Sequence, residues 1–310
     1  MKNLIFSSYK GATYTGGLYL SEIYISSIIG NSQKLDGGAM FGNVPRPVWS
    51  QWYEPDSVGR INLATRAMLI ETGPFKVLCE TGVGAFFEPK LAERFGIQEK
   101  EHVLLNNLEN HGLSHQDITH VILSHLHFDH AGGLLPSWSD QQTGSDDLLF
   151  PNANFLVSAA AWERMLQPHA RDRASFISSL KEKLEGSGRL NIICGKYPED
   201  ELRDFISFDY SEGHTPGQMM TRVKGKNKCI IFVADLIPGA HWIHLPITMG
   251  YDRYPELIID EKRELYKTLE NKDLIFFTHD TMYAISGVQL NTKGKYEAVN
   301  PQKSILRLAI

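Results

Sequence analysis

Short apolar runs, each followed at once by polar or small residues, recur along this chain. Residues 118–124 first alternate and then concentrate β-branched and apolar side chains, as a buried strand does. Residues 205–210, 229–234 and 274–278 have the same strand-like character. Residues 159–166 and 254–270 instead place apolar side chains on one side at helical spacing, which predicts amphipathic helices packed on sheets. The pattern favours an α/β protein.

Imidazole and carboxylate side chains stand at the ends of these predicted strands. The segment 125–130 follows the first strand and has the sequence His-Leu-His-Phe-Asp-His. His214 follows the second strand in a turn bounded by Gly and Pro, Asp235 closes the third, and His279 closes the fourth. Open α/β architectures place their chemistry at the carboxyl ends of strands, so we expect these side chains to meet.

The hexapeptide at residues 125–130 is the most informative segment of the chain. Side chains at this spacing off a strand end converge only if the chain curls around a common point, and a cation is the usual reason for imidazoles to converge. Imidazole and carboxylate ligands suit zinc, iron, manganese or cobalt, and no Cys is close in sequence to indicate a thiolate site. A structural metal or a satisfied polar turn is the alternative, which the rarity of the H-x-H-x-D-H pattern disfavours.

With the downstream residues, this segment resembles the signature of the metallo-β-lactamase superfamily in its binuclear hydrolase form. The resemblance runs from about residue 63 to residue 279, with the motif blocks in matching order. It implies an αβ/βα sandwich of two mixed β-sheets flanked by helices, with the site along one edge. The implied ligands are His125, His127 and His214 for one metal, Asp129, His130 and His279 for the second, and Asp235 as the bridge between them.

Three further segments, residues 37–42, 60–66 and 234–238, resemble the quorum-quenching N-acyl homoserine lactonase-like subgroup and its organophosphate-hydrolase relatives. Two positions depart from that pattern. Glu80 stands where the family has Asp, which changes how that carboxylate braces the neighbouring loops. Leu236 stands close behind the bridging carboxylate, where the lactonases have Tyr. Any acid or oxyanion donor is therefore expected elsewhere, with Tyr251, His241 and His244 as candidates.

The resemblance implies two divalent metal ions per chain, with zinc expected and manganese, iron or cobalt as alternatives. Such ions lower the pKa of a bridging water to about 7, and the resulting hydroxide would open a lactone or cleave an ester. Asp129 would act as the catalytic residue that shuttles the proton to the leaving group. We therefore expect a metal-dependent hydrolase.

Other functions remain compatible with the same residues. A phosphotriesterase or organophosphate hydrolase would use the same binuclear site, and a dioxygenase of this fold would use a single iron. A silent binding protein is disfavoured, because every ligand position is filled. Taken alone, His214 and His279 would each more often be a capped or buried histidine than a ligand.

Three loops predict how substrate would be held. Residues 40–56 carry aromatic side chains among prolines, and we expect them to form a lid over the pocket or to pack on a second subunit. Loops 136–151 and 238–255 add further apolar side chains, which suits a hydrophobic ester or lactone. For each aromatic, a core or interface role is an equal alternative. The expected substrate contacts are Phe41, Trp138, His241, Trp242, Met249 and Tyr251.

Composition bounds the remaining possibilities. The chain has 310 residues and 42% hydrophobic content, and we expect one metallo-β-lactamase-like domain over residues 1–310. A net charge of −5 offers no basic stripe for nucleic acid. No apolar run approaches the roughly 18 residues that span a bilayer, and the apolar stretch within residues 1–10 is too short for a signal peptide, so we expect a cytoplasmic protein, as a monomer or homodimer. The three Cys are expected to be reduced packing residues.

Overall fold

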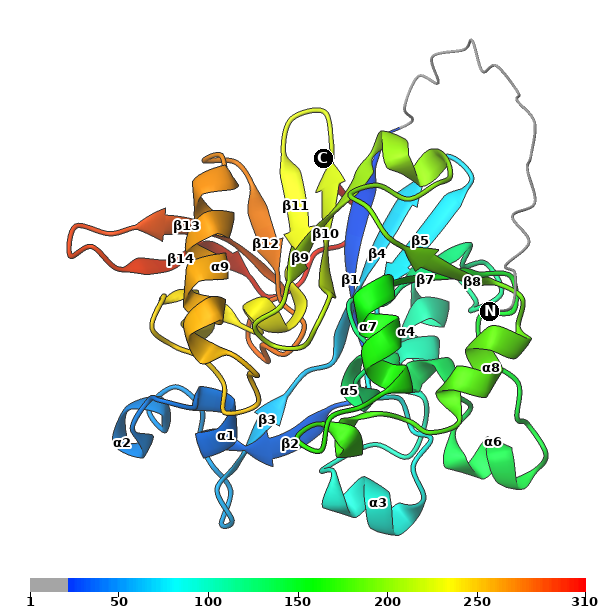
Figure 1. Cartoon of the computed structure of the whole chain (residues 1–310). Coiled ribbons are helices and arrows are strands. Elements are labelled where there is room, and N and C mark those ends of the chain that lie inside the picture. The colour runs from blue at the N-terminus through cyan, green and yellow to red at the C-terminus, as the bar shows by residue number, and fades with distance from the viewer. Residues whose placement is uncertain (1–21) are drawn as a thin grey trace, which may run out of the picture.

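Two β-sheets packed face to face, with helices on their outer faces, make up the computed structural model of this chain (Figure 1). The structure describes residues 22–310. The expectation about residues 1–10 falls outside this range. Within the described range, no helix combines the length and the apolar character needed to cross a bilayer.

The first sheet has the strand order β15-β1-β4-β5-β6-β7-β8. The strands from β5 to β8 run parallel to one another, whereas β1 and β4 are antiparallel to their neighbours. The bounds are β1 (Tyr24–Ile29), β4 (Arg66–Thr72), β5 (Phe75–Cys79), β6 (His120–Ile122), β7 (Asn154–Ser158), β8 (Leu190–Ile193) and β15 (Leu308–Ala309).

The second sheet has the strand order β14-β13-β12-β11-β10-β9. Here β11 and β12 are parallel and the other neighbours are antiparallel, so both sheets are mixed. A small pair, β2 (Gln33–Asp36) and β3 (Arg60–Leu63), lies apart from both. The bounds are β9 (Ile206–Ser211), β10 (Gln218–Lys224), β11 (Cys229–Phe232), β12 (Leu274–Phe276), β13 (Ile285–Leu290) and β14 (Tyr296–Gln302).

Strand β4 shows why the sheets stack in this way. Successive side chains of a strand point to opposite faces. Met68 and Ile70 belong to the core between the two sheets, while Ala67 and Leu69 belong to the core under the helices. A strand buried on both faces has an almost continuous apolar run, as β4 does. The expected sandwich of two mixed sheets flanked by helices is confirmed.

Helices cover the outer face of each sheet (Figure 1). Leu104 and Leu108 of α4, together with Leu180 of α8, pack on the first sheet. Ile258 and Leu265 of α9 pack on the second. The helix bounds are α1 (Gly37–Phe41), α2 (Arg46–Trp49), α3 (Pro89–Arg94), α4 (Val103–Asn110), α5 (Phe128–Ala131), α6 (Trp138–Gln142), α7 (Ala159–Leu166), α8 (Leu180–Gly186) and α9 (Pro255–Thr268), with short 3-10 turns η1 (Gly132–Leu134), η2 (Arg173–Ser175), η3 (Glu201–Asp204), η4 (Ala234–Leu236) and η5 (Ala240–Ile243).

The strands and helices that the sequence predicted lie within a few residues of their expected positions. Helix α7 matches its expected bounds, and α9 is shorter than expected at both ends. The predicted strand 229–234 ends early, as β11, because Ala234 has a φ of 45° that a strand cannot hold. Of the cysteines, Cys79 is buried and Cys229 is half-buried, but Cys194 is exposed, so a packing role does not apply to it.

Candidate metal centre

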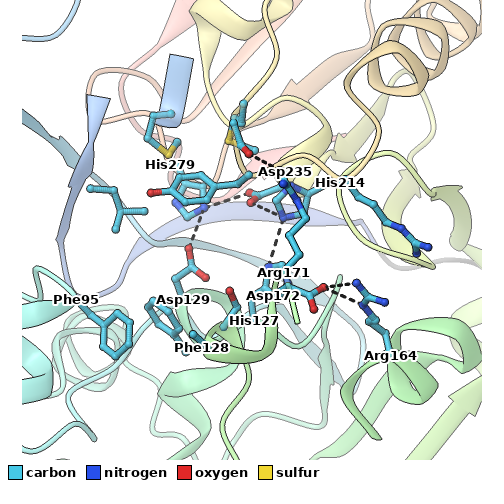
Figure 2. Close-up of a pocket in the computed structure, with 18 residues that line it drawn as sticks. Phe95, His127, Phe128, Asp129, Arg164, Arg171, Asp172, His214, Asp235 and His279 are labelled. Carbon is cyan, nitrogen blue, oxygen red and sulfur yellow. Dashed lines mark hydrogen bonds and ion pairs between the residues drawn. The ribbon is translucent and has the colours of Figure 1, made fainter. Parts of the chain in front are cut away.

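The seven predicted ligands converge at one edge of the sandwich. Those that line the cavity are labelled in Figure 2, namely His127, Asp129, His214, Asp235 and His279. The segment after β6 enters α5 and carries four of them, the turn between β9 and β10 carries another, and the ends of β11 and β12 carry the last two. Strands from both sheets therefore contribute to the site. The residues brought together are His125, His127, Asp129, His130, His214, Asp235 and His279.

Three imidazoles form the first cluster. His125 Nε2 lies 3.0 Å from His127 Nδ1, and His214 Nε2 lies 3.4 Å from that same atom. Nitrogen ligands around a tetrahedral zinc ion are separated by about 3.3 Å, because each Zn–N bond is about 2.0–2.1 Å long. The spacing of these nitrogens suits one divalent cation.

A carboxylate and two imidazoles form the second cluster. His279 Nε2 lies 3.3 Å from His130 Nε2, and Asp129 Oδ2 lies 3.6 and 3.7 Å from the two nitrogens, respectively. The mixture of one oxygen and two nitrogen donors suits a borderline divalent ion such as zinc, manganese, iron or cobalt.

Asp235 lies between the two clusters. Its Oδ2 is 3.3 Å from His214 Nε2 in the first cluster and 3.5 Å from His130 Nε2 in the second. Its Oδ1 is 3.1 Å from His279 Nε2 but, among the residues described, receives no hydrogen bond of acceptable geometry. A buried carboxylate oxygen without a hydrogen bond is costly, and a cation would offset that cost. The donor set therefore fits a pair of divalent ions.

Hydrogen bonds to the far side of each ring orient the imidazoles. His279 Nδ1 donates to Ala64 O at 2.8 Å, which leaves the Nε2 lone pair facing the cluster. His214 Nδ1 lies 2.9 Å from Asp252 Oδ1, and His125 Nδ1 lies 2.9 Å from Ser124 Oγ. Partners of this kind fix the tautomer and raise the basicity of the ligating nitrogen.

Glu80 supports the second cluster in spite of its extra methylene. The side chain is fully buried, and its carboxylate lies 2.9 Å from His130 Nδ1. It also accepts hydrogen bonds from Ser124 Oγ and, at 3.2 Å, from Thr278 Oγ1. One carboxylate thus contacts the candidate ligand His130 directly, and also the residues next to His125 and His279.

Burial and mutual repulsion set the charge of the cluster. Burial, reinforced by neighbouring imidazoles, holds the pKa of His125 and of His127 well below the usual value, so both rings are in the neutral form that binds metals. Burial alone would raise the pKa of Asp235, but His130, His279 and His214 outweigh it and hold that pKa well below its usual value. Asp235 is therefore a carboxylate at neutral pH.

A cavity of about 410 Å³ opens directly onto these ligands. Met249 and Tyr251, two of the expected substrate contacts, line it. Leu35, Met40 and Phe95 add apolar surface, so the beginning of the 40–56 segment also contributes to the wall.

The other expected contacts, Phe41, Trp138, His241 and Trp242, are not among the residues that line this cavity. Phe41 and Trp242 are buried and stack on each other at 4.3 Å. His241 stacks on Trp52, and Trp138 lines a separate cavity formed with α3 and the residues before α8. Phe41 and Trp242 therefore cover each other, as do His241 and Trp52, while Trp138 faces the separate cavity.

Sequence reasoning missed the charged part of the cavity wall. Arg164, Arg171 and Arg253 line it together with Asp172. They come from α7, the loop that follows it and the loop before α9, and no motif links them. The only local signal was the polar face of α7.

The family model of the metallo-beta-lactamase superfamily matches residues 61–139, which include the strand end and hexapeptide that carry four of the candidate ligands. The chain therefore has the metallo-β-lactamase fold and contains a segment that matches that superfamily. The two-sheet sandwich with its candidate site at one edge agrees with that assignment.

Proteins similar to this chain include the N-acyl homoserine lactonase AiiA of Bacillus thuringiensis subsp. kurstaki, which is 25% identical over 71% of this chain and 82% of its own. A probable metal-dependent hydrolase from Staphylococcus aureus is 28% identical, with a TM-score of 0.78 over 94% of this chain and 99% of that one. The dizinc quorum-quenching lactonase AidC shares the fold, with a TM-score of 0.66 at 19% identity over 94% and 97% of the two chains.

These similarities support a metal-dependent hydrolase at the level of the superfamily. The fold implies divalent metal binding, for which the clusters described above are candidate sites.

Proposed function

We propose that this protein is a binuclear metal-dependent hydrolase that opens a lactone or cleaves an ester. The observation that carries the proposal is the position of Asp235, whose two carboxylate oxygens approach imidazoles of both clusters. A carboxylate in that position suits two neighbouring cations better than one.

The proposed ligands divide as the two clusters do. His125, His127 and His214 would hold one ion, Asp129, His130 and His279 the other, and Asp235 both. Zinc is the metal we expect, since imidazoles make up most of the set. When bound, two such ions supply a nucleophilic hydroxide at neutral pH and polarise the oxygen of the substrate.

Asp129 is the group we assign to proton transfer. It lines the cavity, and its Oδ2 faces the second cluster. Apart from His130 and His279, no described residue forms an ion pair or hydrogen bond with its carboxylate. One of its oxygens is therefore free to take up a proton and deliver it to a leaving group within the cavity.

Tyr251 is the best placed of the three candidate donors. It lines the cavity, whereas His241 and His244 do not. Burial, with a smaller effect of Asp129, raises the pKa of Tyr251 to about 12, so the phenol keeps its proton at neutral pH. It can then donate a hydrogen bond to an oxygen that becomes negative during hydrolysis.

We also propose that the 40–56 segment belongs to the same single domain and forms part of the cavity wall. Met40 lines the cavity, while Phe41 and Trp49 are buried in the core beneath it. Asn43 Nδ2 donates to Pro246 O at 2.7 Å, which ties the segment to the loop that carries Tyr251.

The test is turnover by the metal-loaded protein of an acyl-homoserine lactone, an aryl ester and an aryl phosphotriester. Lactone or ester turnover well above buffer, lost on chelation and restored by zinc, is the expected result. Turnover of the phosphotriester alone would replace the proposal with the organophosphate-hydrolase alternative. Oxygen uptake with one iron per chain would replace it with a dioxygenase.

A further inference from the structure

The cavity above the ligand clusters has two chemically different sides. Figure 2 shows Phe95 and Phe128 on one side of the ligands and Arg164 with Asp172 on the other. A substrate that spans the ligands would therefore meet aromatic rings at one end and guanidinium groups at the other.

The three arginines differ in how their charge is balanced. Arg164 donates through Nε and Nη2 to Asp172 Oδ2, both at 2.8 Å, so that pair is neutral overall. Arg171 Nη2 donates to Gly250 O at 2.6 Å and to Asp252 O at 3.0 Å. Backbone carbonyls orient a guanidinium group but do not cancel its charge.

Arg253 is the arginine whose guanidinium is left for a ligand. Within residues 22–310, the guanidinium of Arg253 contacts the ring of Tyr254, which lies 4.7 Å from the guanidinium carbon. No carboxylate of that range is within ion-pair distance of it. Its backbone is fixed beside the site, because Arg253 N donates to His214 O at 3.3 Å and Tyr254 N donates to Gly213 O at 2.8 Å.

The arginines of the cavity wall are positive, whereas the whole protein has a negative net charge. The chain carries a net charge of −5, yet Arg171 and Arg253 place two uncompensated positive charges on one cavity. Besides Asp172, the carboxylates lining it are Asp129 and Asp235, which the proposed function assigns to metal ions. With those two carboxylates bound to metal ions, the remaining charge of the wall is positive, and a positive cleft concentrates anionic ligands.

We propose that the substrate carries an oxyanion, a carboxylate or a phosphate, on the side of the scissile bond opposite its apolar group, and that Arg253 binds this oxyanion. The planar guanidinium fork matches both chemistries. This inference rests on the proposed hydrolase function and narrows its substrate from a purely hydrophobic ester or lactone to an amphiphilic, anionic one.

The first test compares esters of equal length in the metal-loaded protein: p-nitrophenyl hexanoate, mono-p-nitrophenyl adipate, and an analogue ending in phosphate. The wild type should prefer an anionic ester over the neutral one, chiefly through KM. Arg253→Gln should reduce that preference by about tenfold or more, in line with the strength of a charge-assisted hydrogen bond. The carboxylate and phosphate arms identify which oxyanion is favoured.

Two further variants separate charge from geometry and from folding. Arg253→Lys keeps the charge but loses the fork, so it should restore only part of the preference. Arg263→Gln removes an exposed guanidinium of α9 that pairs with Asp260, and it should leave the preference unchanged. If Arg253 served only to pack on Tyr254, its replacement would lower stability without altering the ratio between charged and neutral substrates.

Binding without turnover makes the inference independent of catalysis. Hexanoate and adipate can each bind a metal ion through one carboxylate. Adipate has a second carboxylate, which Arg253 can bind. Calorimetry should show adipate binding about tenfold more tightly than hexanoate in the wild type and Arg263→Gln, but not in Arg253→Gln. An Arg253-dependent preference without hydrolysis of any ester would overturn only the proposed function. Hydrolysis with equal kcat/KM for charged and neutral esters, and equal binding of the two acids, would overturn this inference.

Discussion

The ligand clusters and the arginine wall, which consists of Arg164, Arg171 and Arg253, border the same cavity. The two regions are built in different ways. The ligands stand at strand ends whose backbone is fixed by the sheets, and most of their imidazoles are held by a second hydrogen bond on the far side. The arginines stand on a helix and two loops, and are held by one ion pair, two carbonyls and one aromatic ring.

This difference indicates that the two regions have different roles, metal binding for the clusters and substrate recognition for the wall. Rigid positions suit metal ligands, because coordination tolerates little displacement. Loop positions suit substrate recognition, because they can vary while the scaffold stays the same. Substitutions in the clusters should therefore abolish the chemistry, whereas those in the wall should change which substrate is accepted.

The largest effect is expected from the ligands. His127→Ala and Asp235→Asn should lower metal content and reduce kcat/KM by more than about a hundredfold, beyond the range seen for residues that only support a ligand. Elemental analysis and turnover assays on the same preparations measure both. His111→Ala, at the end of α4 and outside the site, is the matched control. Full metal content in both ligand variants would show that the assignment is wrong.

A smaller effect is expected from the carboxylate behind the second cluster. Glu80→Gln keeps the shape of the side chain but removes the charge beside His130 Nδ1, and should weaken metal binding by about ten- to a hundredfold. Chelator competition gives the affinity, and circular dichroism shows whether the fold persists. Glu71→Gln is the control, because Glu71 lies on β4 of the same sheet and pairs with Arg307 away from the clusters. This substitution should leave the affinity for metal unchanged. Wild-type affinity in a folded Glu80→Gln would refute the supporting role.

The smallest effect is expected from the phenol in the wall. Tyr251 is 43% exposed, so its hydrogen bond should contribute less than a buried oxyanion donor, and Tyr251→Phe should lower kcat by about tenfold with little change in KM. Steady-state kinetics on one ester tests this, with the exposed Tyr197→Phe as the control. An unchanged kcat would assign Tyr251 to substrate packing alone.

The sequence predicted the clusters because their information is local. A buried strand followed by His or Asp places that side chain at a sheet edge, as the structure has it after β6, β9, β11 and β12. The spacing of the hexapeptide then places four donor side chains at this edge, two in each cluster. Only the sheet order, which brings strands of both sheets to the same edge, had to come from the family resemblance.

The wall could not be predicted in the same way. Trp242 and Phe41 looked like pocket residues, but the structure stacks them on each other, and nothing in the local sequence tells which neighbour covers an aromatic ring. Arg164 and Arg171 lie near each other in the sequence, but Arg253 is far along the chain, and the three follow no spacing rule. Their meeting depends on how the loops cross, which a one-dimensional pattern does not contain.

The most direct test of the central claim is the number and position of metal ions in the wild-type protein. Elemental analysis after loading with zinc, followed by anomalous diffraction, should find about two ions per chain, one on each side of the Asp235 carboxylate. A single ion per chain, or ions away from Asp235, would contradict the account.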